Sequence, residues 1–551
     1  MYFEKHSDLI KQAVEAIGQR TYYTPYPELP KFYDADGDAK GKSYIGSILN
    51  TNFHELIQKQ DGCKWVGEEV SPYTQTGIGV LYPQPIISDI VERSKLSITS
   101  WNAISYSERA GILVECLDRV KSRFFDIAYA TMHTTGQSFM MSFQASGPHS
   151  NDRALEAIAM GYRELSLYPR KASWIKPMGK FDLTIEKSWK PIPRGIGLVI
   201  GCSTFPVWNT LPGVFANLIV GNPTIVKPHP KAILPIAIYI AEMQKVFAEA
   251  GVDSNIIQLL PDTINDPVTK QIAEHQDVKL VDYTGGSAFG SYVEGLNKIV
   301  FTEKAGVNCV IIDSVHDMAS VASNLAFSMC LYSGQMCTAP QTVFIPSIGV
   351  KCGDDTLSYE AVVDKLKQSI VDLVNNPKAG AATIGAIQND TTMKRVADIQ
   401  KNNSDAVILE SGVIVNPEFP DARITTPTIL QADKSAKFLF GEECFGPVVF
   451  VVKTDDTNDS VQLAKLISRE KGALTCSAYS TDQNVMNMIE QHMNSVFVPV
   501  SFNFTGAAFI NSHAAFSDLH VTGGNAAGNA SLTNTEFIAK RFVWVGNRYM
   551  G

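Results

Sequence analysis

The central part of the chain alternates short apolar runs with longer stretches of helical pattern. Apolar residues fill 195–202, 223–227, 256–260 and 279–283 almost continuously, and segments with apolar positions at helical spacing separate these runs. Short continuous apolar runs are typical of strands that are buried on both faces, and strands that alternate with helices indicate βαβ units. The pattern therefore predicts a parallel sheet with helices on both faces.

The same alternation resumes further along the chain. An apolar run at 342–346 precedes a helical pattern over 359–375, which predicts a second α/β unit. Before the first unit, the pattern over 84–168 is helical, and Ser107 stands ahead of one of its apolar stripes as a helix-start signal. The expected fold class is therefore α/β.

Three segments depart from this alternation. Residues 20–50 are rich in Pro, Tyr, Asp and Gly, which predicts a long surface arm. Residues 182–189 and 542–545 alternate polar and apolar positions with period two, which predicts strands with one exposed face. No internal repeat and no low-complexity tract is visible in the sequence.

Composition narrows the class of protein. A chain of 551 residues is expected to form two or three domains. The net charge of −9 disfavours nucleic acid and anionic membranes as partners, because both attract basic surfaces. No stretch is apolar and long enough to span a bilayer, and the first residues lack the pattern of a signal peptide.

The cysteines indicate a reducing compartment. Nine are scattered along the chain, and no CxxC pair occurs, so neither a disulfide framework nor a metal site is expected. A cytoplasmic location follows as the expectation. There a cysteine can remain a free thiol.

Cys337 is the candidate nucleophile. Gly334, Thr338 and Pro340 surround it and predict a loop, where a thiolate can be exposed and activated. Most free cysteines are small buried hydrophobes, and Cys330, in the preceding helical run, is interpreted that way. Glu303 follows an apolar run and is the candidate general base, because a partly desolvated carboxylate can deprotonate water near neutral pH.

Other segments carry binding signals. Lys227 ends an apolar run ahead of Pro228, at the carboxyl edge of the predicted sheet, where cofactors bind in open α/β folds. Gly285 and Ser287 lie in a glycine-rich turn ahead of a helix, and a helix N-terminus favours negative charge. Such a turn is weak evidence when it stands alone.

Together these motifs resemble the aldehyde dehydrogenase superfamily. Lys227, Glu303, Cys337 and the string Glu443-Cys444-Phe445-Gly446-Pro447 occur in the family's order and spacing, from about residue 95 to the C-terminus. The resemblance implies an aldehyde dehydrogenase-like fold of two parallel-sheet α/β domains with a small β arm that joins subunits into a homodimer or homotetramer. The expected parts are an N-terminal arm (1–80), an NAD(P)-binding domain (81–175 and 194–305), a catalytic domain (306–530) and the oligomerisation arm (176–193 and 531–551).

The resemblance also implies roles for individual residues. Cys337 would form a thioester with an aldehyde substrate while the nicotinamide accepts hydride, and Glu303 would then activate water to release the acid. Lys227 would bind the adenosine ribose of the cofactor. The remaining cofactor contacts would be Gly285 and Ser287 at the pyrophosphate, and Glu443 and Phe445 at the nicotinamide ribose and ring.

Two positions depart from the family pattern. Pro230 stands where a carboxylate usually binds the 2′-hydroxyl of the ribose, and the loss of that charge favours NADP over NAD, with His229 as a possible aid. Thr204 stands where the family has the asparagine of the oxyanion hole. A hydroxyl has a shorter reach than an amide, so either Thr204 or Asn209 would have to donate there.

The implied function is the NAD(P)-dependent oxidation of an aldehyde to a carboxylic acid. Residues 203–208, 521–528 and the N-terminal arm most resemble the aldehyde dehydrogenase-like proteins of bacterial phenylacetate degradation, which implies a semialdehyde linked to coenzyme A. Three alternatives stay open: a CoA-acylating dehydrogenase, a cysteine hydrolase or acyltransferase that needs no nicotinamide, and a non-catalytic binding protein, which Thr204 motivates.

Overall fold

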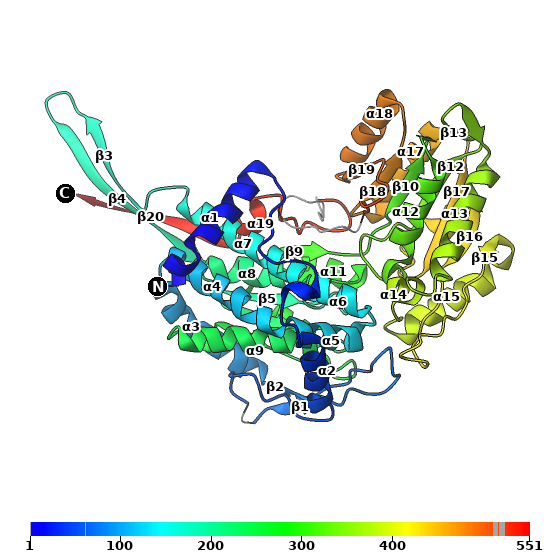
Figure 1. Cartoon of the computed structure of the whole chain (residues 1–551). Helices are drawn as coiled ribbons and strands as arrows, with labels where there is room; N and C mark the ends of the chain where they lie inside the picture. Colours follow the sequence, from blue (N-terminus) through cyan, green and yellow to red (C-terminus); the bar gives the residue numbers. More distant parts are fainter. Residues whose placement is uncertain (1, 61, 511–515, 517–523, 551) are drawn as a thin grey trace.

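Two parallel sheets, each covered by helices, organise the molecule (Figure 1). The structure is a computed structural model and describes residues 2–60, 62–510, 516 and 524–550. Figure 1 shows the two sheets and their helices as neighbouring bodies, with a β arm that projects from the first body on the side away from the second. The expected α/β fold class is confirmed.

The first sheet has five parallel strands in the order β7-β6-β5-β8-β9. The strands are β5 (Ile196–Ile200), β6 (Thr224–Lys227), β7 (Ile257–Leu259), β8 (Val278–Thr284) and β9 (Ile299–Glu303). The four apolar runs predicted as strands are therefore confirmed. The chain builds outward from β5 in one direction and then returns to its other side through β8, so the carboxyl ends of β5 and β8 form a topological switch point, where α/β folds bind ligands.

Helices cover this sheet. The connecting helices are α8 (Leu211–Ile219), α9 (Leu234–Glu249), α10 (Thr269–Glu274) and α11 (Ser287–Glu294). The predicted helical region contributes α3 (Ile87–Ala103), α4 (Tyr106–Val120), α5 (Phe124–Thr135), α6 (Phe139–Ser146) and α7 (Pro148–Ser166). The helix-start signal at Ser107 was misplaced by two residues, because the N-cap of α4 is Ser105, whose hydroxyl accepts the Glu108 N–H at 3.1 Å.

The N-terminal residues are more ordered than a surface arm. α1 (Tyr2–Gln19) packs on α4 and α7, and α2 (Gly37–Ile48) packs on α5. A Cβ on Gly37 would lie 2.2 Å from the Phe125 ring, so this glycine allows two helices to approach closely. The surface arm predicted over 20–50 is wrong in this part, because a glycine that was interpreted as a turn signal serves helix packing. Shorter elements nearby are the 3₁₀ turn η1 (Pro30–Phe32), β1 (Lys64–Val66) and β2 (Tyr82–Gln84).

The second sheet has seven strands in the order β15-β16-β17-β12-β10-β18-β19, and only the β15–β16 pair is antiparallel. The strands are β10 (Cys309–Ile312), β12 (Thr342–Pro346), β15 (Val407–Leu409), β16 (Thr428–Asp433), β17 (Val448–Thr454), β18 (Cys476–Tyr479) and β19 (Val500–Phe502). Its helices are α12 (Met318–Cys330), α13 (Tyr359–Val374), α14 (Gly380–Ile384), α15 (Asp390–Asn402), α16 (Lys437–Phe440), α17 (Thr457–Lys471) and α18 (Gln483–Asn494). A small sheet of β11 (Ser314–Val315), β13 (Val350–Cys352) and β14 (Asp355–Leu357) lies beside them. The second α/β unit is confirmed.

The projecting arm is a three-stranded antiparallel sheet in the order β20-β4-β3. Its strands are β3 (Lys171–Pro177), β4 (Asp182–Pro193) and β20 (Phe542–Met550), so both period-two predictions are confirmed. The arm begins earlier than the expected residue 176, because β3 pairs with β4 from Lys171 onward. The short helix α19 (Glu536–Ala539) and Arg541 precede β20, and Arg541 forms a buried ion pair with Asp282 of β8 at 2.6 Å.

No helix in the described ranges has the length and apolar character needed to cross a membrane. The other domain boundaries drawn from the sequence stay predictions. Part of the 521–528 motif, residues 521–523, lies outside the described residues.

Candidate active site

Cys337 lies in a tight loop that follows α12 and leads into β12 of the second sheet. Just before it, Tyr332, Ser333 and Gly334 have φ values of 51°, 53° and 63°, and two of these three are not glycine. Such backbone costs free energy and persists only where the surroundings hold it. Here the Tyr332 hydroxyl donates to the Thr135 carbonyl at 2.5 Å, and the Ser333 hydroxyl donates to the Ile384 carbonyl at 3.0 Å. The loop that presents the thiol is therefore fixed by its neighbours.

Asn308 supports the loop from the other side. Its side-chain nitrogen donates to the Cys337 carbonyl at 2.7 Å and to the Ala339 carbonyl at 3.1 Å. Its side-chain oxygen accepts the backbone N–H groups of Leu474 and Thr475 at 3.0 and 3.1 Å. One buried amide thus connects the Cys337 loop to the start of β18. The sequence analysis gave Asn308 no role, since only the fold brings these segments together.

The thiol of Cys337 is hydrogen-bonded to the carboxylate of Glu303. Glu303 ends β9, is 7% exposed, and its carbonyl accepts the Gly285 N–H at 3.0 Å. Burial raises the pKa of Glu303, while the charge of Arg153 and the Cys337 hydrogen bond oppose that rise. Burial and the neighbouring Glu303 also raise the pKa of the Cys337 thiol well above its ordinary value. The two groups can therefore share a proton, with Glu303 as the acceptor when the thiol becomes a thiolate.

Thr204 and Asn209 lie in the turn that connects β5 to α8. Thr204 is 9% exposed, and its carbonyl accepts from the Gln137 side chain at 2.8 Å. The side-chain amide of Asn209 donates to the sulfur of Cys202 at 3.5 Å. Of the two candidate oxyanion donors, Asn209 is therefore directed toward another sulfur, and the role given to Thr204 stays a prediction.

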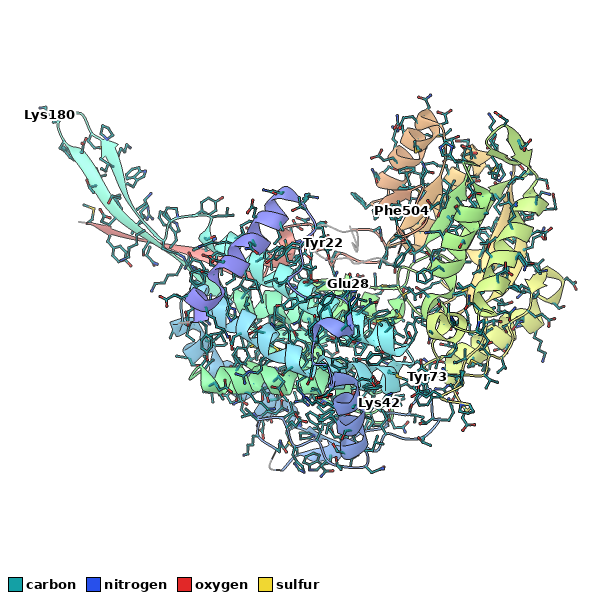
Figure 2. All side chains as sticks on the ribbon, in the orientation of Figure 1. Tyr22, Glu28, Lys42, Tyr73, Lys180 and Phe504 are labelled. Carbon is teal, nitrogen blue, oxygen red and sulfur yellow. The ribbon has the colours of Figure 1, made fainter. Side chains whose placement is uncertain are left out.

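A large, mostly apolar cavity opens beside Cys337. It has a volume of about 720 Å³ and contacts Cys337, Phe205, Trp208 and Phe504. A polar pair also reaches its wall, the Glu28 carboxylate and the His149 imidazole, whose atoms lie 3.0 Å apart. Figure 2 labels Glu28, on the segment between α1 and α2, and Phe504, which follows β19, so both ends of the chain contribute to this cavity. An apolar aldehyde fits such a wall.

A second, small cavity lies on the side of Glu303. Its volume is about 30 Å³, which is enough for one water molecule or two. Charged and polar groups contribute much of its wall, including Arg153, Asn209, Asp282 and Glu303. The guanidinium carbon of Arg153 lies 3.9 Å from the centre of the Trp208 ring, so Trp208 stands between this cavity and the large one. The sequence analysis missed Arg153.

The carboxyl edge of the first sheet carries one set of predicted cofactor residues. Lys227, at the end of β6, forms a buried ion pair with Asp262, which follows β7. Burial lowers the pKa of Lys227, and Asp262 opposes that change. Pro230 is buried nearby in the sequence, and burial lowers the pKa of His229 to about 4, so His229 is neutral. The Asp262 carboxylate beside Lys227 was not predicted from the sequence.

The glycine-rich turn stands at the first turn of α11. Gly286 is its N-cap, without a side-chain hydrogen bond to the helix, and Ser287 is exposed. Gly285 has a φ of 158°, and a Cβ built there would lie 2.6 Å from the Tyr283 hydroxyl. The free N–H groups of this helix start fit a pyrophosphate.

Glu443 and Phe445 lie against the Cys337 loop. They border a small cavity of about 20 Å³ together with Gly306 and Met336. The Glu443 carboxylate accepts the Gly306 N–H at 3.5 Å, and burial raises its pKa to about 7. A carboxyl group with so few protein partners has capacity for the hydroxyls of a ribose. The structure thus divides the predicted cofactor residues between the edge of the first sheet and the neighbourhood of Cys337.

Comparison with known proteins identifies a protein family that this chain matches. The sequence model of the aldehyde dehydrogenase family matches residues 65–527. A benzaldehyde dehydrogenase of Bacillus subtilis (strain 168) is 25% identical over 431 residues, which cover 75% of this chain and 82% of that protein. An alpha-ketoglutaric semialdehyde dehydrogenase of the same strain is 23% identical, over 84% of this chain and 91% of the relative.

Solved structures agree with this result. The crystal structure of an NAD-dependent aldehyde dehydrogenase from Burkholderia multivorans is 42% identical, covers 100% of this chain and 99% of its own, and superposes with a TM-score of 0.96. A 1-pyrroline-5-carboxylate dehydrogenase from Thermus with bound NAD shares the fold at a TM-score of 0.74 and 16% identity, over 96% of this chain and 99% of its own.

Proposed function

The chain belongs to the aldehyde dehydrogenase family, and from that premise we propose that it oxidises an apolar aldehyde to its carboxylic acid through a thioester on Cys337. A nicotinamide dinucleotide is the cofactor of the proposed reaction. The observation that carries the proposal is the Cys337 thiol, which is hydrogen-bonded to Glu303 and opens onto an apolar cavity of about 720 Å³.

Cys337, Thr204 and Glu303 each have a separate role in the proposed reaction. Cys337 gives its proton to Glu303 and adds to the aldehyde carbon, and the oxyanion that forms accepts hydrogen bonds from the Cys337 N–H and the Thr204 hydroxyl. A bound nicotinamide supplies the two-electron acceptor for the aldehyde carbon. After Glu303 has released that first proton to solvent, it takes a proton from water, and the resulting hydroxide adds to the thioester carbon and breaks the C–S bond. The departing Cys337 thiolate then takes the proton back from Glu303, and the acid is released.

We propose NAD as the preferred cofactor, although the missing carboxylate at Pro230 favours NADP. Asp262 already balances the charge of Lys227, and the neutral His229 adds no positive charge. The 2′-phosphate of NADP would therefore meet the Lys227–Asp262 pair, which has no net positive charge, and the Asp262 carboxylate would repel it. The NAD dependence of the 42% identical enzyme from Burkholderia multivorans supports the same choice.

Binding measurements separate the two cofactors. Quenching of tryptophan fluorescence should give a lower Kd for NAD than for NADP. Asp262→Asn removes the carboxylate while it keeps the shape of the side chain, so it should improve NADP binding relative to NAD by about threefold to tenfold. Tighter binding of NADP in the parent protein would restore the interpretation based on Pro230.

The substrate follows from the cavity wall. Phe205 and Trp208 come from the 203–208 segment and give the wall aromatic surfaces, and the Bacillus subtilis relative acts on benzaldehyde according to its name. We propose an aromatic or ring-derived aldehyde. The resemblance of that segment to PaaN, the phenylacetic acid degradation protein, extends the proposal to a CoA-linked semialdehyde of aerobic phenylacetate degradation. No Lys or Arg is among the described lining residues, so the phosphates of CoA would remain outside the cavity.

The test is absorbance at 340 nm with NAD or NADP across aromatic, aliphatic and CoA-linked aldehydes, each with and without free CoA. Reduction of the cofactor that depends on the aldehyde supports the dehydrogenase, and the best substrate identifies the class. A requirement for free CoA would change the acyl acceptor from water to CoA. Cofactor binding without any reduction would favour a binding protein, the alternative that Thr204 motivates and that the engagement of Asn209 with Cys202 supports.

We also propose that the β arm joins two copies of the chain into a homodimer, or into a homotetramer. Its three strands and the turn between β3 and β4 expose apolar side chains to solvent: Trp174, Ile175, Met178, Phe181, Ile192, Val543, Val545, Tyr549 and Met550. A three-stranded sheet that projects from a body requires a covering surface, and a second copy supplies the same strands. Light scattering should give a multiple of the chain mass, and Ile175→Asp with Phe181→Asp should reduce it to that of one chain.

A further inference from the structure

Arg153 is a buried cation close to the proposed reaction centre. Its side chain comes from α7, only 7% of the residue is exposed, and its guanidinium stacks on Trp208 at 3.9 Å. It lines the small cavity that Glu303 also lines. Burying a guanidinium is costly unless nearby negative charge or hydrogen bonds compensate for the lost water. The position of Arg153 therefore requires negative charge beside it.

The charged groups in and near this cavity act on different partners. Asp282 of β8 forms its own ion pair with Arg541 at 2.6 Å. Asp152, the neighbour of Arg153 on α7, acts on tyrosines of the N-terminal segment, whose pKa values are raised first by burial and further by the Asp152 charge: Tyr22, Tyr23, Tyr26 and Tyr33. The negative groups that act on Arg153 are Glu156 of α7, Glu303 of β9 and Cys337.

The surroundings of the Cys337–Glu303 pair disfavour its ionisation, and the positive charge of Arg153 favours it. Glu303 is buried and Cys337 is half-buried, and the other groups that act on Cys337, namely Cys202 and Glu443, make its ionisation harder. Arg153 is the cation whose charge favours the ionised form of Glu303. Because Trp208 lies between Arg153 and the apolar cavity, the guanidinium acts on the pair without reaching the aldehyde.

We propose that Arg153 is the counter-ion of the Cys337–Glu303 pair and stabilises the single negative charge that the pair carries after its first proton leaves. The guanidinium lines the same small cavity as the Glu303 carboxylate, and the Cys337 thiol is hydrogen-bonded to that carboxylate, so Arg153 acts on the charge in either position. Arg153 is thus a positioning residue for the nucleophile. The inference rests on the proposed function only for its purpose, because the charge balance exists without cofactor or aldehyde.

The test measures the alkylation of Cys337 by iodoacetamide as a function of pH, in the protein without cofactor, with mass spectrometry to identify the modified peptide. Arg153→Met should raise the midpoint of this profile by about one pH unit or more and slow alkylation at pH 7 about tenfold. Arg153→Lys, which keeps a positive charge, should stay closer to the parent protein than Arg153→Met. Glu156→Gln should shift the midpoint in the opposite direction, because it removes a competing negative charge.

Arg163→Met is the matched control, since Arg163 lies on the same helix, is partly exposed and is bonded to Glu164 rather than to the pair. It should leave the profile unchanged. An unshifted profile in folded Arg153→Met would overturn the proposal, as would a shift in Arg153→Lys as large as in Arg153→Met. If thermal unfolding shows that Arg153→Met does not fold, the alkylation profiles of Arg153→Lys and Arg153→Gln are compared instead. The proposal then expects the larger shift in the uncharged Arg153→Gln, and equal shifts would overturn it. A protein that oxidises no aldehyde but shows these shifts would refute the proposed function and leave this inference standing.

Discussion

The two cavities on either side of Trp208 differ in size and in chemistry. The cavity with Arg153 and Glu303 has a volume of about 30 Å³ and a wall with several charged groups, while the cavity with Phe205 and Phe504 has about 720 Å³ and a mostly apolar wall. Water and protons fit the first, and an apolar substrate fits the second. The comparison suggests that proton transfer and substrate recognition are separated by one indole ring. Cys337 lines the apolar cavity and is hydrogen-bonded to Glu303, which lines the polar one.

The largest expected effect comes from Cys337→Ala, which removes the thiol that lines the apolar cavity and is hydrogen-bonded to Glu303 of the polar cavity. Turnover should fall by about 10⁴-fold or more, because no thioester can form. The Kd for the cofactor, measured by fluorescence, should change less than about twofold. Cys330→Ala is the control, since Cys330 is fully buried in α12 and should affect stability rather than turnover. Retained turnover in Cys337→Ala would refute the nucleophile.

The second-largest effect is expected from a change in the small cavity that Arg153 and Glu303 line. Glu303→Gln should lower turnover by about 10²- to 10⁴-fold, because an amide cannot accept the proton from water. In the parent protein burial raises the pKa of Glu303 above 4.5, so the carboxylate fraction, and with it the release of acid, should increase with pH through that raised value. A pH–rate profile of the hydrolytic phase would show this rise. The same rise in Glu303→Gln would assign the proton acceptor to another group.

A smaller effect should appear when only the apolar cavity is changed. Phe504→Ala removes part of the aromatic wall and should raise KM for aromatic aldehydes about tenfold, since the lost apolar contact is worth roughly 1–2 kcal/mol. The pH–rate profile should not move. Phe438→Ala is the matched control, because Phe438 is 85% exposed and far from the wall in sequence. A shift of the pH profile in Phe504→Ala would show that the cavities are not independent.

The smallest effect should come from the polar pair in the apolar wall. Glu28→Gln removes the carboxylate that lies against His149 in this wall, and partly exposed polar pairs of this kind contribute about 0–1 kcal/mol. KM for neutral aldehydes should change less than about threefold. A loss as large as that of Phe504→Ala would show that the N-terminal segment recognises a polar group of the substrate.

The sequence predicted the parts of the fold whose pattern is local. Apolar runs such as 223–227 form central strands, because a strand buried on both faces has no polar positions. The failures came where a local signal had a tertiary use. Gly37 was interpreted as part of a surface arm, but it lies against Phe125, and the strand that starts at Lys171 is defined by its pairing with β4.

The sequence by itself determined which residues are candidates for the chemistry, because that choice depends on residue type and order. Cys337, Glu303, Lys227 and Glu443 could be named because their spacing follows a family pattern. Only the tertiary structure decided what surrounds them: Arg153 facing Glu303, Asp262 against Lys227, and the amide of Asn209 turned toward Cys202. The reason is physical. The charge state of a buried group depends on which other charges lie within a few ångströms, and residues far apart in the sequence reach that distance only in the folded chain.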